Sequence, residues 1–72
     1  MSDNSIYKII ELVGSSSVSW EDAAKSAVEK ASKTLDDIRI AEITKFDIRV
    51  DDGKLTYRTR LTVSFKLRES AD

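Results

Sequence analysis

A two-armed alternating pattern centred on Asp52-Gly53 constrains the fold more than any other feature of the sequence. An Asp-Gly pair between two strand-like segments is a strong short-range signal for a β-hairpin. The arms span Ile38–Val50 and Lys54–Arg68, with the turn at Asp51-Asp52-Gly53. The second arm places these side chains on one face: Leu55, Tyr57, Thr59, Leu61, Val63, Phe65 and Leu67. This period of two predicts a strand with one apolar face.

The first arm shows the same alternation with an interruption. One face carries Ile38, Ile40, Phe46, Ile48 and Val50. In a regular strand, Glu42 and Thr44 would fall on that same apolar face. A carboxylate in such a place needs a counter-charge. Glu42 is therefore a candidate either for a salt bridge to a neighbouring subunit or for a cation site.

Two further elements precede the hairpin. The β-branched, apolar run Ile6–Val13 predicts a strand, and Gly14 with the serines up to Ser17 predicts a loop. A helix is expected over Trp20–Leu35, with Ser19 as N-cap, Asp22 as a variant capping-box residue and Trp20 as a packing residue near the first turn. The helix has an apolar stripe made mostly of alanine: Ala24, Ala27, Val28, Ala31 and Leu35.

The relative sizes of these elements predict self-association. At about 3.3 Å per residue, each hairpin arm is about 40 Å or more long, whereas a helix of about sixteen residues spans about 24 Å. One alanine-rich helix cannot cover such a hairpin. A chain of 72 residues also needs extra stabilisation, and the absence of Cys and His excludes disulfides and a typical structural zinc site. A symmetric homo-oligomer is the remaining solution.

Charge and hydropathy exclude several function classes. The formal net charge is −1, which does not provide the basic field that nucleic-acid binding needs. No apolar run reaches the roughly 18 residues of a membrane span, and residues 1–5 lack the pattern of a signal peptide. The expected location is therefore cytoplasmic. Catalysis is not expected, because the chain has no His base, no Cys nucleophile and no glycine-rich phosphate loop.

Four segments together resemble the dodecin family. They are YKIIELVGSS (7–16), SWEDA (19–23), ASKTL (31–35) and VSFKL (63–67), and their order and spacing cover nearly the whole chain. The resemblance implies an α+β fold: a β-α-β-β subunit with a bent three-stranded antiparallel sheet wrapped around one helix. It also implies one domain over residues 1–72 and assembly into a hollow homododecamer.

The resemblance locates the positions that bind flavin in most dodecins. The ring-stacking Trp of the family corresponds to Ile40, the hydrogen-bonding Gln to Arg58, and a basic residue to Asp47. All three differ, and an isoleucine provides no aromatic face for stacking. Flavin binding is therefore not expected. A two-residue turn at Asp52-Gly53 would place Asp47 opposite Arg58, so that the two substituted positions pair with each other.

The same substitutions are similar to a divergent branch described as calcium dodecins, through DDIR (36–39), Asp47, GKLTYR (53–58) and SFK (64–66). The candidate calcium ligands are Glu42, Asp36 and Asp37, although no EF-hand spacing is present. A three-fold axis could bring three copies of one carboxylate together. The leading hypothesis is a calcium-binding dodecin-like shell. Alternatives are a flavin-sequestering shell with a rearranged pocket and a purely structural shell.

Overall fold

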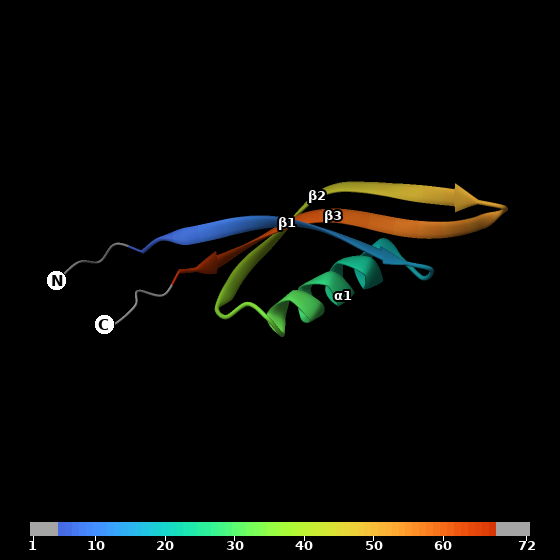
Figure 1. Cartoon of the computed structure of the whole chain (residues 1–72). Coiled ribbons are helices and arrows are strands. Elements are labelled where there is room, and N and C mark those ends of the chain that lie inside the picture. Colours follow the sequence, from blue (N-terminus) through green and yellow to red (C-terminus); the bar gives the residue numbers. More distant parts are fainter. Residues whose placement is uncertain (1–4, 68–72) are drawn as a thin grey trace.

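The computed structural model describes residues 5–67 and contains one helix and three strands. In chain order these are β1 (Tyr7–Ser16), α1 (Trp20–Ser32), β2 (Ile38–Asp51) and β3 (Lys54–Lys66). The strands form one antiparallel sheet in the order β1-β3-β2, so β3 is central. The sheet curves over α1, and the β2–β3 hairpin projects beyond the helix (Figure 1). The predicted β-α-β-β fold is confirmed.

The first strand is longer than the sequence pattern indicates. Gly14, Ser15 and Ser16 belong to β1 and pair with Thr59, Arg58 and Tyr57, although a loop was expected there. Gly14 is buried, and a Cβ at this position would overlap the carbonyl oxygen of Ala23 and lie 3.1 Å from the Cβ of Ala27. The glycine is therefore required for close packing of β1 on α1 and does not end the strand.

The helix has the predicted start and an earlier end. The Ser19 hydroxyl accepts a hydrogen bond from the backbone N–H of Asp22 at 3.0 Å, which confirms the N-cap. The Asp22 carboxylate accepts from the Ser16 hydroxyl at 2.7 Å. It thereby links the helix start to β1. The α-helix ends at Ser32 and not at Leu35. Directly after it, Lys33 N–H donates to the Lys30 carbonyl and Thr34 N–H to the Ala31 carbonyl, and both bonds are of the 3₁₀ type.

The hairpin turn is the expected two-residue turn. Asp52 and Gly53 have φ angles of 53° and 77°, as a type I′ turn requires. Asp51 pairs with Lys54, and the register places Asp47 directly opposite Arg58. The predicted pairing of these two residues is confirmed.

Two irregularities in β2 change which residues of the first arm lie on each face of the sheet. The register with β3 shifts between Ile38 and Ile40 and again between Ile43 and Lys45. Each shift inserts one residue and exchanges the two faces of the strand beyond it. As a result, Glu42 lies opposite Thr62, and Ile40 lies opposite Ser64. Neither lies on the apolar face that carries Phe46, so the expectation that Glu42 interrupts that face is wrong.

We call the sheet face that packs on α1 the inner face and the opposite one the outer face. The inner face supplies a small core, in which Ala23, Leu61, Val63 and Thr59 are fully buried. The Thr59 hydroxyl donates to the Trp20 carbonyl at 3.0 Å, so this buried polar group is satisfied.

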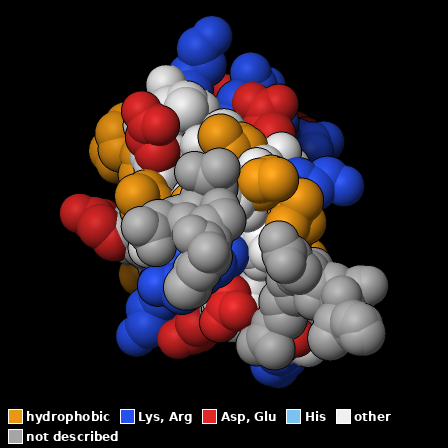
Figure 2. Space-filling model, turned by 90° about the vertical axis from the view of Figure 1, so that its left-hand side faces the viewer, with side chains coloured by type: hydrophobic (Ala, Val, Ile, Leu, Met, Phe, Trp, Pro, Cys, Tyr) orange, Lys and Arg blue, Asp and Glu red, His pale blue; other side chains and the backbone are white. Residues whose placement is uncertain are grey.

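Most large apolar side chains remain exposed in the single chain. Phe46 is 56% exposed and Val50 70%. The chain measures 58 × 20 × 14 Å, and its radius of gyration of 15.4 Å exceeds the roughly 11 Å of a compact domain of this length. An end-on view shows hydrophobic side chains at the surface between charged ones (Figure 2). No helix in residues 5–67 is long and apolar enough to cross a bilayer.

Candidate ligand-binding face

An ion pair on the outer face joins β2 and β3, the two strands of the hairpin. Arg58 Nε donates to Asp47 Oδ1 at 2.6 Å, and Arg58 Nη2 donates to Asp47 Oδ2 at 2.8 Å. This two-pronged geometry is the strongest form of the Arg–carboxylate interaction. The side chains are still 43% and 45% exposed in the single chain. Arg58 and Asp47 thus satisfy each other, as the sequence analysis proposed.

The pair changes the protonation behaviour of both groups. The hydrogen bonds from Arg58 hold the pKa of the Asp47 carboxyl below its usual value of 3.8. Partial loss of hydration opposes this lowering of the pKa. The positive charges of Arg58, Arg60 and Lys45 lower the pKa further. The bond to Asp47 raises the pKa of Arg58. Asp47 therefore carries its negative charge throughout the neutral and mildly acidic range.

The pH dependence of this pair provides a first prediction. A carboxyl whose folded pKa is depressed stabilises the fold above its unfolded pKa and loses that contribution as the pH falls through the folded value. We expect a double-mutant cycle of Asp47→Ala and Arg58→Ala to show favourable coupling at pH 7 that decreases as the pH is lowered below 3.8, the usual pKa of the Asp carboxyl. Urea denaturation over a series of pH values measures the coupling. Additive single-mutant effects at pH 7 would contradict the prediction.

An aromatic cluster lies behind the ion pair, on the inner face. The Trp20 ring centroid is 5.4 Å from that of Phe46 and 5.4 Å from that of Tyr57, the latter in an edge-on arrangement. The Trp20 indole N–H also donates to the backbone carbonyl of Asp47 at 3.0 Å. The predicted packing role of Trp20 is confirmed. Sequence reasoning missed its contact with Asp47, because no local pattern connects a helix start to the middle of β2.

Ile40 lies on the outer face but far from the ion pair. Its side chain is 65% exposed, and its partner Ser64 is six residues from Arg58 along β3. At about 3.3 Å per residue this separation is about 20 Å. The three positions identified by the resemblance therefore do not converge within one chain, and a ligand touching all of them requires a second copy.

The candidate calcium ligands also do not converge in one chain. Glu42 is exposed on the outer face. Asp36 is exposed in the α1–β2 connection, beyond the end of the helix. Asp37 is half-buried with a positive φ of 59°, and its backbone carbonyl accepts from the Lys66 N–H at 3.3 Å. Within residues 5–67 no three Asp or Glu side chains are grouped closely enough to hold a metal ion.

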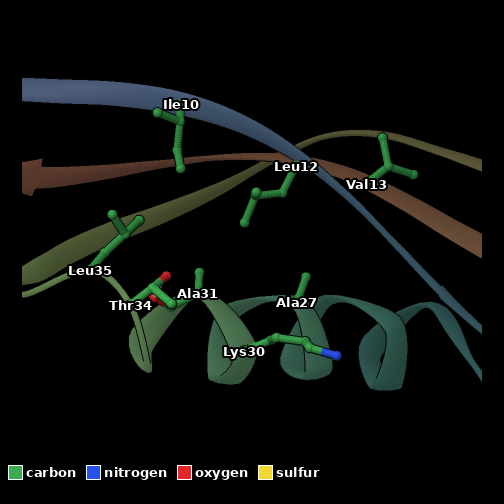
Figure 3. A pocket seen from close by; sticks show the side chains of 8 residues that line it. All are labelled: Ile10, Leu12, Val13, Ala27, Lys30, Ala31, Thr34 and Leu35. Carbon is green, nitrogen blue, oxygen red and sulfur yellow. The ribbon is translucent and has the colours of Figure 1, made fainter.

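A groove between β1 and the C-terminal half of α1 is a second concave surface, which the sequence analysis did not identify. Its volume is about 360 Å³. Figure 3 shows Ile10 and Leu12 of β1 pointing toward Ala27 and Ala31 of α1 across it. The lining consists of Ile10, Leu12, Val13, Ala27, Lys30, Ala31, Thr34 and Leu35. The small alanines of the helix leave this space open because they do not reach the strand.

Comparison with known proteins gives consistent matches along nearly the whole chain. A family model described as Dodecin matches residues 6–68. A calcium dodecin from Mycobacterium tuberculosis is 51% identical over 65 residues, covering 89% of this chain and 92% of that protein.

Solved structures give the same result. A crystal structure of the M. tuberculosis calcium dodecin, described as a calcium-chelating antigen with a calcium-binding site, superposes with a TM-score of 0.83 at 48% identity, covering 93% of this chain and 97% of the other. A dodecin from Streptomyces coelicolor gives a TM-score of 0.88 at 31% identity, covering 96% of this chain and all of the other.

Proposed function

The chain belongs to the dodecin family, and from this premise we propose that it assembles into a hollow homododecamer that binds calcium and not flavin. The observation that carries the proposal is the 51% identity to a calcium dodecin over nearly the full length of both chains. The proposed role is binding or storage of a small ligand or ion, without catalysis.

The geometry of the outer face supports the exclusion of flavin. Ile40 offers no flat ring for stacking. Arg58 uses two of its N–H groups on Asp47, so two of the three flavin positions are already paired with each other. A flavin bound there would have to break a charge-assisted contact and receive no stacking energy in return.

Calcium binding requires carboxylates from more than one copy. Calcium takes about six to eight oxygen ligands, and one chain offers no grouped set of three acidic side chains within residues 5–67. A symmetric assembly can place equivalent carboxylates around an axis. Glu42, exposed in the middle of the long strand β2, is the first candidate, and Asp36 and Asp37 are the others.

Calorimetric titration of the purified protein with calcium and with riboflavin tests this function. We expect saturable heat with calcium and none with riboflavin, from a particle whose mass by light scattering is about twelve subunits. Glu42→Gln should lower calcium affinity by about tenfold or more, because it removes one charged ligand from each copy. Glu29→Gln, which changes an exposed helix carboxylate, is the matched control.

Other outcomes separate the alternatives. Tight riboflavin binding would support a flavin-sequestering shell that tolerates Ile40. A particle of the expected mass that binds neither ligand would support a structural shell. Unchanged calcium affinity in Glu42→Gln would indicate that Asp36 and Asp37, and not Glu42, are the calcium ligands.

A further inference from the structure

The projecting end of the β2–β3 hairpin carries an apolar strip on its inner face. The strip consists of Phe46, Ile48, Val50 and Leu55, which are between 40% and 70% exposed in the single chain. Taking about 200 Å² for each fully exposed side chain, the strip leaves about 400 Å² of apolar surface in water. This area is about half of what one partner contributes to a standard protein–protein interface.

The groove between β1 and the C-terminal half of α1 matches the strip in length. Its helical wall is formed by Ala27 and Ala31, whose small side chains leave a volume of about 360 Å³ open (Figure 3). From Ala27 to Leu35 the groove extends about 12 Å at the rise of a helix. The strip extends about 13 Å from Phe46 to Val50 at the rise of a strand. The groove can therefore accept the strip along its full length.

Both surfaces are apolar where they would touch. The charged residues at the hairpin end are two cations and two carboxylates, which lie on the outer face or in the turn: Arg49, Asp51, Asp52 and Lys54. In the groove, the charged lining residue in the described part of the chain is Lys30, which is exposed. Its ammonium group can stay in water while its stem covers apolar surface. The strip can therefore be covered by the groove without burying an unbalanced charge.

The strip and the groove cannot meet within one chain. The strip begins where Phe46 contacts Trp20, at the start of α1, and continues away from the helix, whereas the groove lies at the other end of α1 (Figure 1). From the rise of the helix and of the strand, Ala31 and Val50 are about 30 Å apart. Each copy therefore presents both surfaces, and only another copy can bring them together.

We propose that the apolar strip of one copy lies in the groove of the next copy, head to tail, with Val50 and Leu55 against Ala27 and Ala31. With a comparable area from the groove, each copy would bury about 800 Å² in its two contacts, which is the contribution of one partner to a standard interface. A head-to-tail contact generates a closed ring when its rotation closes. The inference rests on the assembly in the proposed function and names the contact that builds it.

Chemical cross-linking tests the contact, because the chain has no cysteine of its own. Lys30→Cys at the groove and Asp51→Cys at the end of the strip are combined in one chain and treated with a short bismaleimide. We expect links between copies, seen on a denaturing gel as a ladder that ends at the number of copies in one ring. Lys25→Cys with Asp51→Cys is the matched control, since Lys25 is exposed on α1 outside the groove. It should give no more product than either single-cysteine variant.

Filling the groove is a second test, independent of cross-linking. Ala31→Trp places a large side chain where the strip would lie, and we expect it to reduce the particle to single chains or small species by light scattering. Ser26→Trp is the matched control, because Ser26 is exposed on the same helix outside the groove, and it should keep the full mass. Circular dichroism of both variants distinguishes dissociation from unfolding.

Two results would overturn the contact. One is a particle of full mass in which the Lys30→Cys, Asp51→Cys chain gives no more links than the control, which would leave the groove open to another partner or a small apolar ligand. The other is a full-mass particle for Ala31→Trp. In both cases assembly itself would stand. Failure of the proposed function is a different observation: an unmodified protein that stays a single chain, or a cross-linked particle of full mass that shows no calcium heat.

Discussion

Replacing Gly14 by alanine is expected to destabilise the subunit by about 3 kcal/mol, and replacement by valine is expected to prevent stable folding. At an exposed, unstrained position, a Gly→Ala change usually stabilises a protein, because it reduces the freedom of the unfolded chain. Here the added Cβ would overlap the Ala23 carbonyl oxygen, which is part of the backbone of α1. The clash can be relieved only by moving the helix away from β1, which opens the core around Leu61.

The measurement is urea denaturation at one fixed protein concentration, because assembly makes apparent stability depend on concentration. Ser15→Ala is the matched control, since Ser15 is the exposed neighbour on the same strand. We expect its effect to stay within about 0.5 kcal/mol. If Gly14→Ala were as stable as Ser15→Ala, the helix would have room to shift, and Gly14 would not set its distance from the sheet.

The sequence predicts those parts of the fold and site that depend on local chemistry. An Asp-Gly pair between alternating arms determines a two-residue turn, and that turn determines which residues of the hairpin face each other. The pairing of Asp47 with Arg58 follows from this chemistry and is confirmed at hydrogen-bond distance. Ser19 could likewise be identified as a helix N-cap, because capping depends on residues within one turn.

Features that depend on tertiary packing could not be predicted from the sequence. The two irregularities of β2 have no Gly or Pro to mark them, so the polar interruption at Glu42 and Thr44 does not by itself indicate a change of face, and the expected face of Glu42 and Ile40 is wrong. Gly14 was interpreted as a loop residue because a glycine needed for close helix packing and one needed for a turn look alike in sequence. The hydrogen bond between Trp20 and Asp47 joins residues 27 positions apart, so no local sequence pattern predicts it.

The second large effect is expected at the end of the hairpin that projects past α1. On its inner face, Val50 is 70% exposed and its cross-strand partner Leu55 is 45% exposed. With Phe46 and Ile48 they form an apolar strip that stays largely exposed in the single chain, although Trp20 packs against Phe46 at one end of it. A symmetric shell would bury this strip against another copy. We expect Leu55→Glu to dissociate the particle into small species, because every copy would then bury an uncompensated carboxylate, at a cost of several kcal/mol each.

Light scattering coupled to size-exclusion chromatography measures the result. Thr56→Glu is the matched control: it introduces the same charge one residue away, on the outer face opposite Arg49, and should leave the mass unchanged. Circular dichroism of both variants distinguishes dissociation from unfolding. A particle of full mass for Leu55→Glu would mean that the strip faces solvent in the assembly. The contacts between copies would then have to come from the sheet edges β1 and β2, whose backbone groups are the other large unsatisfied surface of the subunit.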